Sequence, residues 1–151
     1  MNLASLTGPE LIFPSLRAAD RHAVLRHLAE AVVASGHLDD ADELHRRLEE
    51  RESLGSTGIG SGVAIPHCKL TGLDHVLLAV AVTDRPVSFG AVDGEPVRLF
   101  FLVVSPHDAP AAHLQCLAAI SRWVKADAHA EEILDLESSA AIYRLLGGGE
   151  G

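Results

Sequence analysis

The sequence predicts an α/β fold in which a mixed β-sheet is sandwiched between helices within a single domain. Apolar residues recur at helical spacing near both ends of the chain, and continuous apolar runs typical of buried strands fill its middle. A turn signal between two of those runs favours an antiparallel pair, so a purely parallel sheet is not expected. The 151 residues, without a long linker, match one ordinary domain. We assign residues 1–146 to that domain and the glycine-rich 147–151 to a flexible tail.

Two helices are expected before the central strands. Asp20 is a capping residue for a helix that continues to about Ser35, and Gly36 supplies a left-handed stop. Asp39 or Asp40 begins the second helix, which Gly55 ends. Both segments carry apolar side chains on one stripe, as helices that cover a sheet require.

Short strands are predicted in the middle of the chain. Residues Val63 to Ile65 form a brief apolar run, and His75 to Thr83 form a longer one that fits a strand buried on both faces. The segments Val87 to Val92 and Val97 to Ser105 flank Asp93-Gly94, which predicts a hairpin.

Helices are expected again after the strands. One runs from about Ala111 to Lys125, and a shorter helical piece lies near Glu131 to Leu136. Ser138 caps a final helix that Gly147 stops. The inner side of the longest of these helices is predicted to consist of Leu114, Leu117, Ala118, Ile120, Ser121 and Val124.

Composition excludes several classes of function. The formal net charge of −9 argues against a broad nucleic-acid footprint, which needs clustered Lys and Arg. The longest clean apolar stretch, Val76 to Val82, is far too short to span a bilayer, so no direct membrane insertion is expected. The two cysteines are too few for a disulfide framework and suit a reducing compartment. We therefore expect a cytoplasmic protein.

A glycine-spaced loop is the first feature that suggests chemistry. The run from Gly55 to Gly62 lets successive backbone N–H groups, including those of Gly58 and Gly60, point into one concavity that could bind phosphate oxygens. The hydroxyls of Ser56 and Thr57 add two donors. The loop lacks the lysine of a nucleotide-binding P-loop, and no long strand precedes it as in a dinucleotide fold.

His67 and Arg51 complete a candidate site for phosphoryl transfer to nitrogen. Pro66 restricts the backbone so that the imidazole of His67 is held at a strand end beside the loop. A neutral imidazole is nucleophilic near pH 7, and its second nitrogen then needs an acceptor for its proton. Arg51, at the end of the preceding helix, offers a planar fork that matches phosphate. When the donor is another phosphohistidine, no Mg²⁺ is required, so we expect neither a metal nor a cofactor.

The run from Arg51 to His67, RESLGSTGIGSGVAIPH, closely resembles the signature of enzyme IIA domains of the fructose/mannitol class. These domains belong to the bacterial phosphoenolpyruvate-dependent phosphotransferase system, and the class includes the nitrogen-related regulatory enzyme IIA proteins. Residues 86–97, PVSFGAVDGEPV, and 113–118, HLQCLA, are similar to further segments of the family. The resemblance therefore covers nearly the whole chain and implies the same sandwiched sheet.

The resemblance also implies roles for individual residues. His67 would be the phosphoacceptor, charged by the phosphocarrier HPr or its nitrogen-branch counterpart. Arg51 would assist at the phosphoryl group, His113 would be a second histidine beside the acceptor, and Ser56 and Thr57 would lie near the phosphate. The phosphoryl group would then pass to an enzyme IIB domain or control regulatory target proteins. Glu52 matches a family position without an evident chemical role.

Several alternatives stay open at this point. A nitrogen-related regulatory protein is favoured by the single-domain length, and a sugar-specific enzyme IIA is the alternative. A binding module on the same fold, as in the cytoplasmic domains of anion exchangers, need not keep the reactive pair, so His67 and Arg51 argue against it. A zinc hydrolase is disfavoured, because a single helix cannot present both His107 and His113 when Pro110 lies between them.

Overall fold

In the computed structural model, which describes residues 2–126 and 129–148, helices and strands follow the predicted order. The helices are α1 (Arg21–Ala34), α2 (Ala41–Ser53), α3 (Pro110–Lys125), α4 (His129–Glu132) and α5 (Ser139–Leu145), with 3-10 turns η1 (Leu3–Leu6), η2 (Pro9–Leu11) and η3 (Ile133–Asp135). The strands are β1 (Ile12–Leu16), β2 (Gly58–Gly60), β3 (Val63–Ala64), β4 (His67–Leu70), β5 (Leu77–Val87) and β6 (Val97–Pro106).

These strands form one mixed sheet, as predicted. Its order is β1-β5-β6-β3-β2, and β4 also pairs with β6. The central hairpin of β5 and β6 is antiparallel, whereas β1 runs parallel to β5 and both β3 and β4 run parallel to β6. β3 and β4 therefore lie one after the other along the same side of β6.

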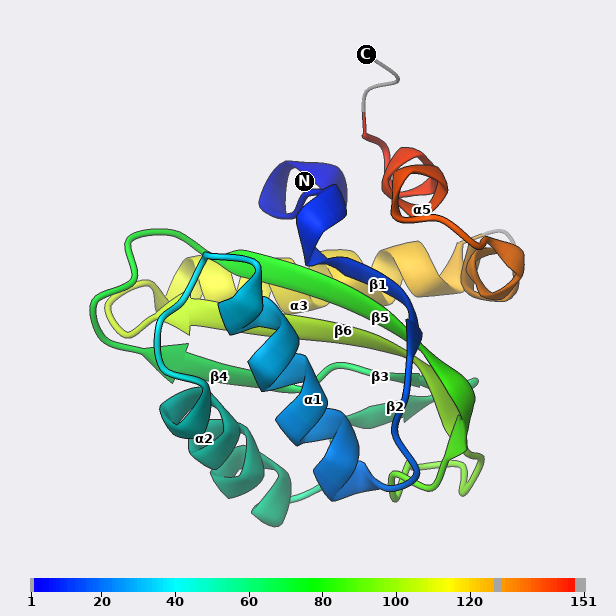
Figure 1. Cartoon of the computed structure of the whole chain (residues 1–151), viewed down its shortest axis with the longest axis horizontal. Coiled ribbons are helices and arrows are strands. Elements are labelled where there is room, and N and C mark those ends of the chain that lie inside the picture. Colours follow the sequence, from blue (N-terminus) through cyan, green and yellow to red (C-terminus); the bar gives the residue numbers. More distant parts are fainter. Residues whose placement is uncertain (1, 127–128, 149–151) are drawn as a thin grey trace.

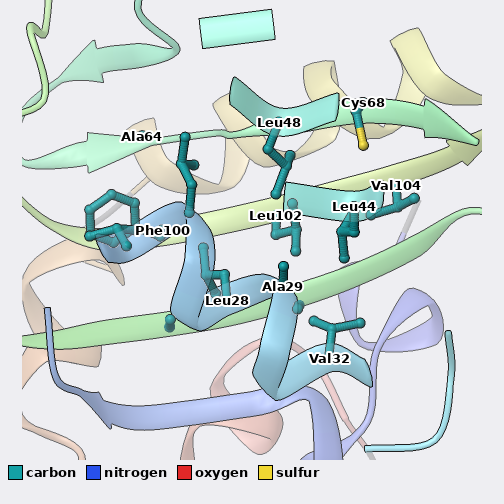
Figure 2. Close-up of a cluster of buried hydrophobic side chains, with 14 of the residues drawn as sticks. Leu28, Ala29, Val32, Leu44, Leu48, Ala64, Cys68, Phe100, Leu102 and Val104 are labelled. Atoms are coloured by element: carbon teal, nitrogen blue, oxygen red, sulfur yellow. The ribbon is translucent and has the colours of Figure 1, made fainter. Parts of the chain in front are cut away.

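Helices cover both faces of the sheet (Figure 1). Along β6, Phe100, Leu102 and Val104 face one side, and Phe101 and Val103 face the other, because side chains alternate along a strand. The first set packs with Leu28, Val32, Leu44 and Leu48 of α1 and α2 (Figure 2). The second set packs with α3 and the C-terminal segments. The sandwich of the predicted fold is thus two cores separated by one sheet.

Short-range signals specify the helix ends. The carboxylates of Asp20 and Asp40 accept the amides of Ala23 and Glu43, so these residues are the N-caps of α1 and α2. Gly36 has φ +93°, the left-handed conformation expected of a helix stop. Ser138 caps α5 through the amide of Ala141. All of these predicted boundaries are confirmed.

The hairpin prediction was wrong in its first strand. Residues 88–92 are not a strand; instead β5 continues to Val87 and is itself the partner of β6. The segment after Val87 leaves the sheet because Phe89, 1% exposed, turns into the core. The turn at Gly94 is present, with φ +75° and its amide bonded to the carbonyl of Ala91.

The inner face of α3 was predicted correctly only in part: Ile120 is buried and Leu117 and Val124 pack against the core, but Ala118 is exposed. Leu114 is 65% exposed, whereas His113 beside it is 6% exposed and faces the sheet with Cys116 and Ile120. Strands β1, β2 and β4 were not predicted, because each is short and carries a proline or glycines, or lacks a regular apolar alternation.

The first two residues of the predicted tail, Gly147 and Gly148, form the C-terminal cap of α5. The amides of Gly147 and Gly148 bond to the carbonyls of Arg144 and Tyr143 at the end of α5, and Gly147 has φ +103°. The side-chain amide of Asn2 donates to the carbonyl of Gly147. Residues 149–151 lie outside the described part. Within that part, no helix has the length and apolar character needed to cross a membrane.

Candidate functional site

His67 lies where two collinear strands meet. β3 pairs with β6 at Leu99 and Phe100, and β4 pairs with it from Val103 onward, so Ile65 and Pro66 form the break between them. Proline has no N–H for a ladder, but the carbonyl of Pro66 accepts the amide of Val103 and holds the break to the sheet. His67 is therefore fixed at the first position of β4.

The alternation of β4 directs His67 and Cys68 to opposite faces. Cys68 packs in the core under α1 and α2 (Figure 2), while His67 lies level with Val103, which faces α3. Burial raises the pKa of the Cys68 thiol to about 12, so this sulfur does not compete as a nucleophile. The imidazole of His67 is only half-buried and is open to a partner molecule.

Hydrogen bonds define which nitrogen of His67 is free to react. Its Nδ1 lies 2.8 Å from the carbonyl oxygen of Ile65, and because a carbonyl only accepts, Nδ1 carries the proton. Nε2 therefore holds a lone pair. Burial, opposed by the Ile65 hydrogen bond, lowers the pKa of His67, and the charges of Arg51 and Lys69 lower it further. The ring is thus neutral and nucleophilic at pH 7.

Arg51 meets His67 at the reactive nitrogen. Its Nε donates to Nε2 of His67 at 3.3 Å, and its Nη1 donates to the carbonyl of Gly55 at 2.9 Å. The second bond anchors the guanidinium to the loop that follows α2 and holds the cation beside the imidazole. The predicted proximity of these two residues, 16 apart in the sequence, is present in the structure.

His113 completes the site from α3, on the face of the sheet opposite to α2, which carries Arg51. The rings of His67 and His113 have centroids 5.3 Å apart, and His113 Nδ1 lies 2.6 Å from the hydroxyl of Ser105. Lys69, two residues beyond His67 on the same face of β4, adds a cation whose charge lowers the pKa of both rings. Sequence reasoning missed Ser105 and Lys69, although the period of two along a strand could have indicated Lys69.

The loop donors predicted to face a phosphate are bound to other protein groups. The hydroxyl of Ser56 donates to the carbonyl of Phe89 and accepts the amide of Gly58. The amide and hydroxyl of Thr57 both donate to Glu52. Next to Gly60, which has φ +98°, the amide of Ser61 donates to the carboxylate of Asp93. The structure does not direct these donors at His67, and their contact with a phosphoryl group stays a prediction.

Glu52 acquires a structural role that the sequence did not suggest. Its side chain is buried beneath the loop, only 4% exposed, and accepts both donors of Thr57. Burial raises the pKa of this carboxyl, and the Thr57 hydrogen bonds oppose the rise. Glu52 therefore holds the glycine loop against the end of α2, next to the carbonyl that anchors Arg51.

The stability of the protein is expected to fall in mildly acid solution because His113 is held neutral. Burial, with the charges of His67 and Lys69, lowers the pKa of His113 from 6.5 to about 4. Below pH 6.5 the unfolded chain binds a proton at this ring that the folded chain does not. The free energy of unfolding therefore decreases as the pH falls from 6.5 toward 4, and His67, whose pKa is also lowered, acts in the same direction.

Urea unfolding at about pH 7.5 and about pH 5 measures this effect, with a lower midpoint expected at the acid pH. A His113→Gln variant lacks the titrating ring and should show a smaller difference between the two midpoints. Glu52, with its raised pKa, contributes stability that is lost as the pH rises, but it is present in both proteins. Equal pH dependence in the two proteins would contradict the assignment to His113.

The site combines a neutral imidazole with an unprotonated Nε2, a guanidinium and a second imidazole. Among residues 2–126 and 129–148, no group of three or more His, Cys, Asp and Glu side chains is arranged to hold a metal. Residues 5–148 match the family model described as "Phosphoenolpyruvate-dependent sugar phosphotransferase system, EIIA 2". The chain therefore belongs to the enzyme IIA type 2 family of the phosphotransferase system.

Curated relatives include both regulatory and sugar-specific proteins. The chain is 37% identical over 147 residues to a nitrogen regulatory protein of Bradyrhizobium diazoefficiens, covering 97% of this chain and 95% of the relative. It is 30% identical over 145 residues to the fructose-specific EIIA component of Haloferax volcanii, covering 96% and 94%. The family resemblance of the sequence is confirmed by these comparisons.

Solved structures confirm the fold. The nitrogen regulatory protein IIA-Ntr of Neisseria meningitidis superposes with a TM-score of 0.87 at 26% identity, over 95% of this chain and 98% of that one. Enzyme IIA of the mannitol system of Escherichia coli, solved in complex with its phosphorylated enzyme IIB, superposes with a TM-score of 0.77 at 21% identity, over 94% and 97%.

Proposed function

We propose that the protein accepts a phosphoryl group on Nε2 of His67 from an HPr-like phosphocarrier protein. One observation carries the proposal. The Nδ1–H of His67 is held by the carbonyl of Ile65, so Nε2 is unprotonated, and its lone pair accepts a hydrogen bond from the Nε of Arg51 at 3.3 Å. A nucleophile and the cation that would stabilise the incoming charge are thereby placed together.

The transfer needs no proton to leave the His67 ring. The Nε2 lone pair attacks phosphorus, a P–N bond forms to His67, and the P–N bond of the donor phosphohistidine breaks, with its electron pair returning to the donor ring. The proton on Nδ1 stays bonded to the Ile65 carbonyl throughout. The guanidinium of Arg51, anchored to Gly55, exchanges its contact with Nε2 for the phosphoryl oxygens. Lys69 adds positive charge nearby.

Exposed apolar side chains adjoin the site and suit a transient protein partner. Leu54, 84% exposed, caps the helix that carries Arg51, and Leu114, 65% exposed, follows His113. Exposed leucines beside a polar reactive centre are typical of a contact surface. We infer that the donor protein docks over these residues and places its phosphohistidine above His67.

A Leu54→Glu variant is expected to raise the donor concentration needed for half-maximal phosphorylation, because the added charge disrupts an apolar contact. The folding stability should not change, since the side chain is exposed. Ala140→Glu on α5, which packs against β1 at the opposite edge of the sheet, is the matched control. Steady-state transfer kinetics with a phosphorylated HPr-like donor measure both variants, and equal effects of the two substitutions would exclude docking at Leu54.

We propose that the phosphorylated protein has a regulatory role and does not supply a sugar transporter. Relatives named nitrogen regulatory proteins support this assignment. Their alignments with this chain cover 97% of the chain and 95% of each relative. In that case the phosphorylation state of His67 controls target proteins. In the sugar-specific alternative, which the fructose-specific relative supports, the group passes to a cysteine of an enzyme IIB domain. Rapid loss of label to an added IIB protein would favour the alternative.

Incubation of the protein with a phosphorylated HPr-like donor tests the proposal directly. Intact-mass analysis and ³¹P NMR are expected to show one acid-labile phosphoryl group per chain, mapped to Nε2 of His67. Failure to acquire the label, from a donor that phosphorylates another enzyme IIA in parallel, would leave the non-phosphorylated binding module as the better description.

A further inference from the structure

In both histidines of the site, Nδ1 forms a hydrogen bond, but the two partners are different kinds of group. Nδ1 of His67 bonds to a backbone carbonyl, which accepts only, and Nδ1 of His113 bonds to the hydroxyl of Ser105, which donates or accepts. The tautomer of His67 follows directly from its partner. The tautomer of His113 depends on where the hydroxyl hydrogen of Ser105 points.

The surroundings of Ser105 determine that direction. Ser105 lies in β6, is 0% exposed, and pairs with Lys69 of β4 through the backbone ladder. In the described part of the chain, its hydroxyl makes no hydrogen bond other than the one to His113. If His113 donated from Nδ1, the hydroxyl hydrogen would be buried without an acceptor, which is costly. If Ser105 donates, its buried hydroxyl hydrogen is satisfied by the Nδ1 lone pair of His113, and the 2.6 Å distance suits an O–H donor.

We propose that Ser105 is a positioning residue that holds His113 in the tautomer with its proton on Nε2. The two imidazoles then have opposite tautomers: His67 presents a lone pair at Nε2, and His113 presents an N–H donor at Nε2, on the side of its ring away from Ser105. The ring centroids are 5.3 Å apart, and we expect this donor to reach a phosphoryl group on His67. The consequence for catalysis rests on the proposed phosphoacceptor role of His67.

The tautomer matters because His113 remains uncharged at neutral pH. Burial lowers its pKa to about 4, so the ring carries a single N–H at pH 7. With that proton on Nδ1, the ring would present a lone pair toward the negatively charged phosphoryl oxygens. With the proton on Nε2, it donates a hydrogen bond to them. One buried hydroxyl thus decides whether the second histidine attracts or repels the transferred group.

The tautomer is measurable by ¹⁵N NMR of the histidine side chains in the unphosphorylated protein. We expect Nδ1 to be bare and Nε2 protonated in His113, and the reverse in His67. A protonated Nδ1 in His113 of the wild-type protein would overturn the proposal. This result does not depend on phosphorylation, so it is distinguishable from failure of the proposed function.

Two variants then link the tautomer to transfer. In Ser105→Ala, His113 should lose its single-tautomer signature, and the rate of phosphorylation should fall by about tenfold, the factor expected for one net hydrogen bond. Ser105→Thr keeps the hydroxyl and should restore both. A role for Ser105 in packing alone would leave the ¹⁵N signature of Ser105→Ala unchanged, and that outcome would refute the positioning role.

Discussion

Substitution of His67 by alanine is expected to abolish acid-labile phosphorylation completely. The variant lacks the unprotonated Nε2 that accepts a hydrogen bond from Arg51, in a ring whose Nδ1 proton is held by the carbonyl of Ile65. Loss of the nucleophile leaves nothing for the neighbouring groups to assist, because Cys68 is buried and its pKa is raised to about 12. Intact-mass analysis after incubation with a phosphorylated HPr-like donor measures the remaining label.

The same substitution should leave the fold intact. His67 is half-buried, and the Ile65 carbonyl that it frees lies at a partly open site where water can replace the bond. We expect the free energy of unfolding to change by about 1 kcal/mol or less. His107→Ala, which removes an exposed histidine after β6, is the matched control and should be labelled like the wild type. Equal labelling of the His67 variant would eliminate this residue as the acceptor.

Substitution of Arg51 by alanine is expected to reduce the rate of phosphorylation by about 10²–10³-fold, the loss typical when one preorganised donor to a developing charge is removed. Arg51→Lys should be intermediate, because lysine keeps the positive charge but cannot donate through a planar fork to Gly55 and the phosphoryl group together. Rapid-quench measurements with a phosphorylated donor give the rates.

The Arg51 variant should also change how transfer depends on pH. The charge of Arg51 helps to lower the pKa of His67, so its removal raises that pKa. A larger fraction of the ring is then protonated and unreactive in mildly acid solution, and the acid limb of the pH–rate profile moves to higher pH. Arg46→Ala, an exposed arginine earlier on α2 that pairs with Glu43, is the control. Wild-type rates in Arg51→Ala would contradict the proposed charge stabilisation.

Phosphorylation would change the character of the proposed docking surface. A phosphoryl group on His67 adds roughly two negative charges to a site whose residues Arg51 and His113 are followed in the sequence by the exposed Leu54 and Leu114. A partner that binds this apolar surface distinguishes the two states through the presence or absence of that charge. Such a switch requires no change of fold, which is consistent with a site built on the ends of α2, β4 and α3.

The sequence by itself determined the features whose physical cause lies within a few residues. The caps at Asp20 and Ser138, a cap at Asp39 or Asp40, the stop at Gly36 and the buried runs of β5 and β6 are local signals, and the structure confirms them with Asp40 as the second cap. The signature from Arg51 to His67 identified the family because its residues are contiguous. The same reasoning failed at Leu114, an apolar residue that was placed on the inner side of α3 and is 65% exposed.

Only the tertiary structure decided the arrangement of hydrogen bonds around the two imidazoles. Arg51 reaches His67 because α2 packs beside β4, and Ser105 reaches His113 because β6 and α3 pack face to face. Likewise, Thr57 turns to the buried Glu52 rather than to a phosphate. A residue's sequence neighbours do not specify which buried partner completes its hydrogen bonds, since that partner arrives only when distant segments pack together.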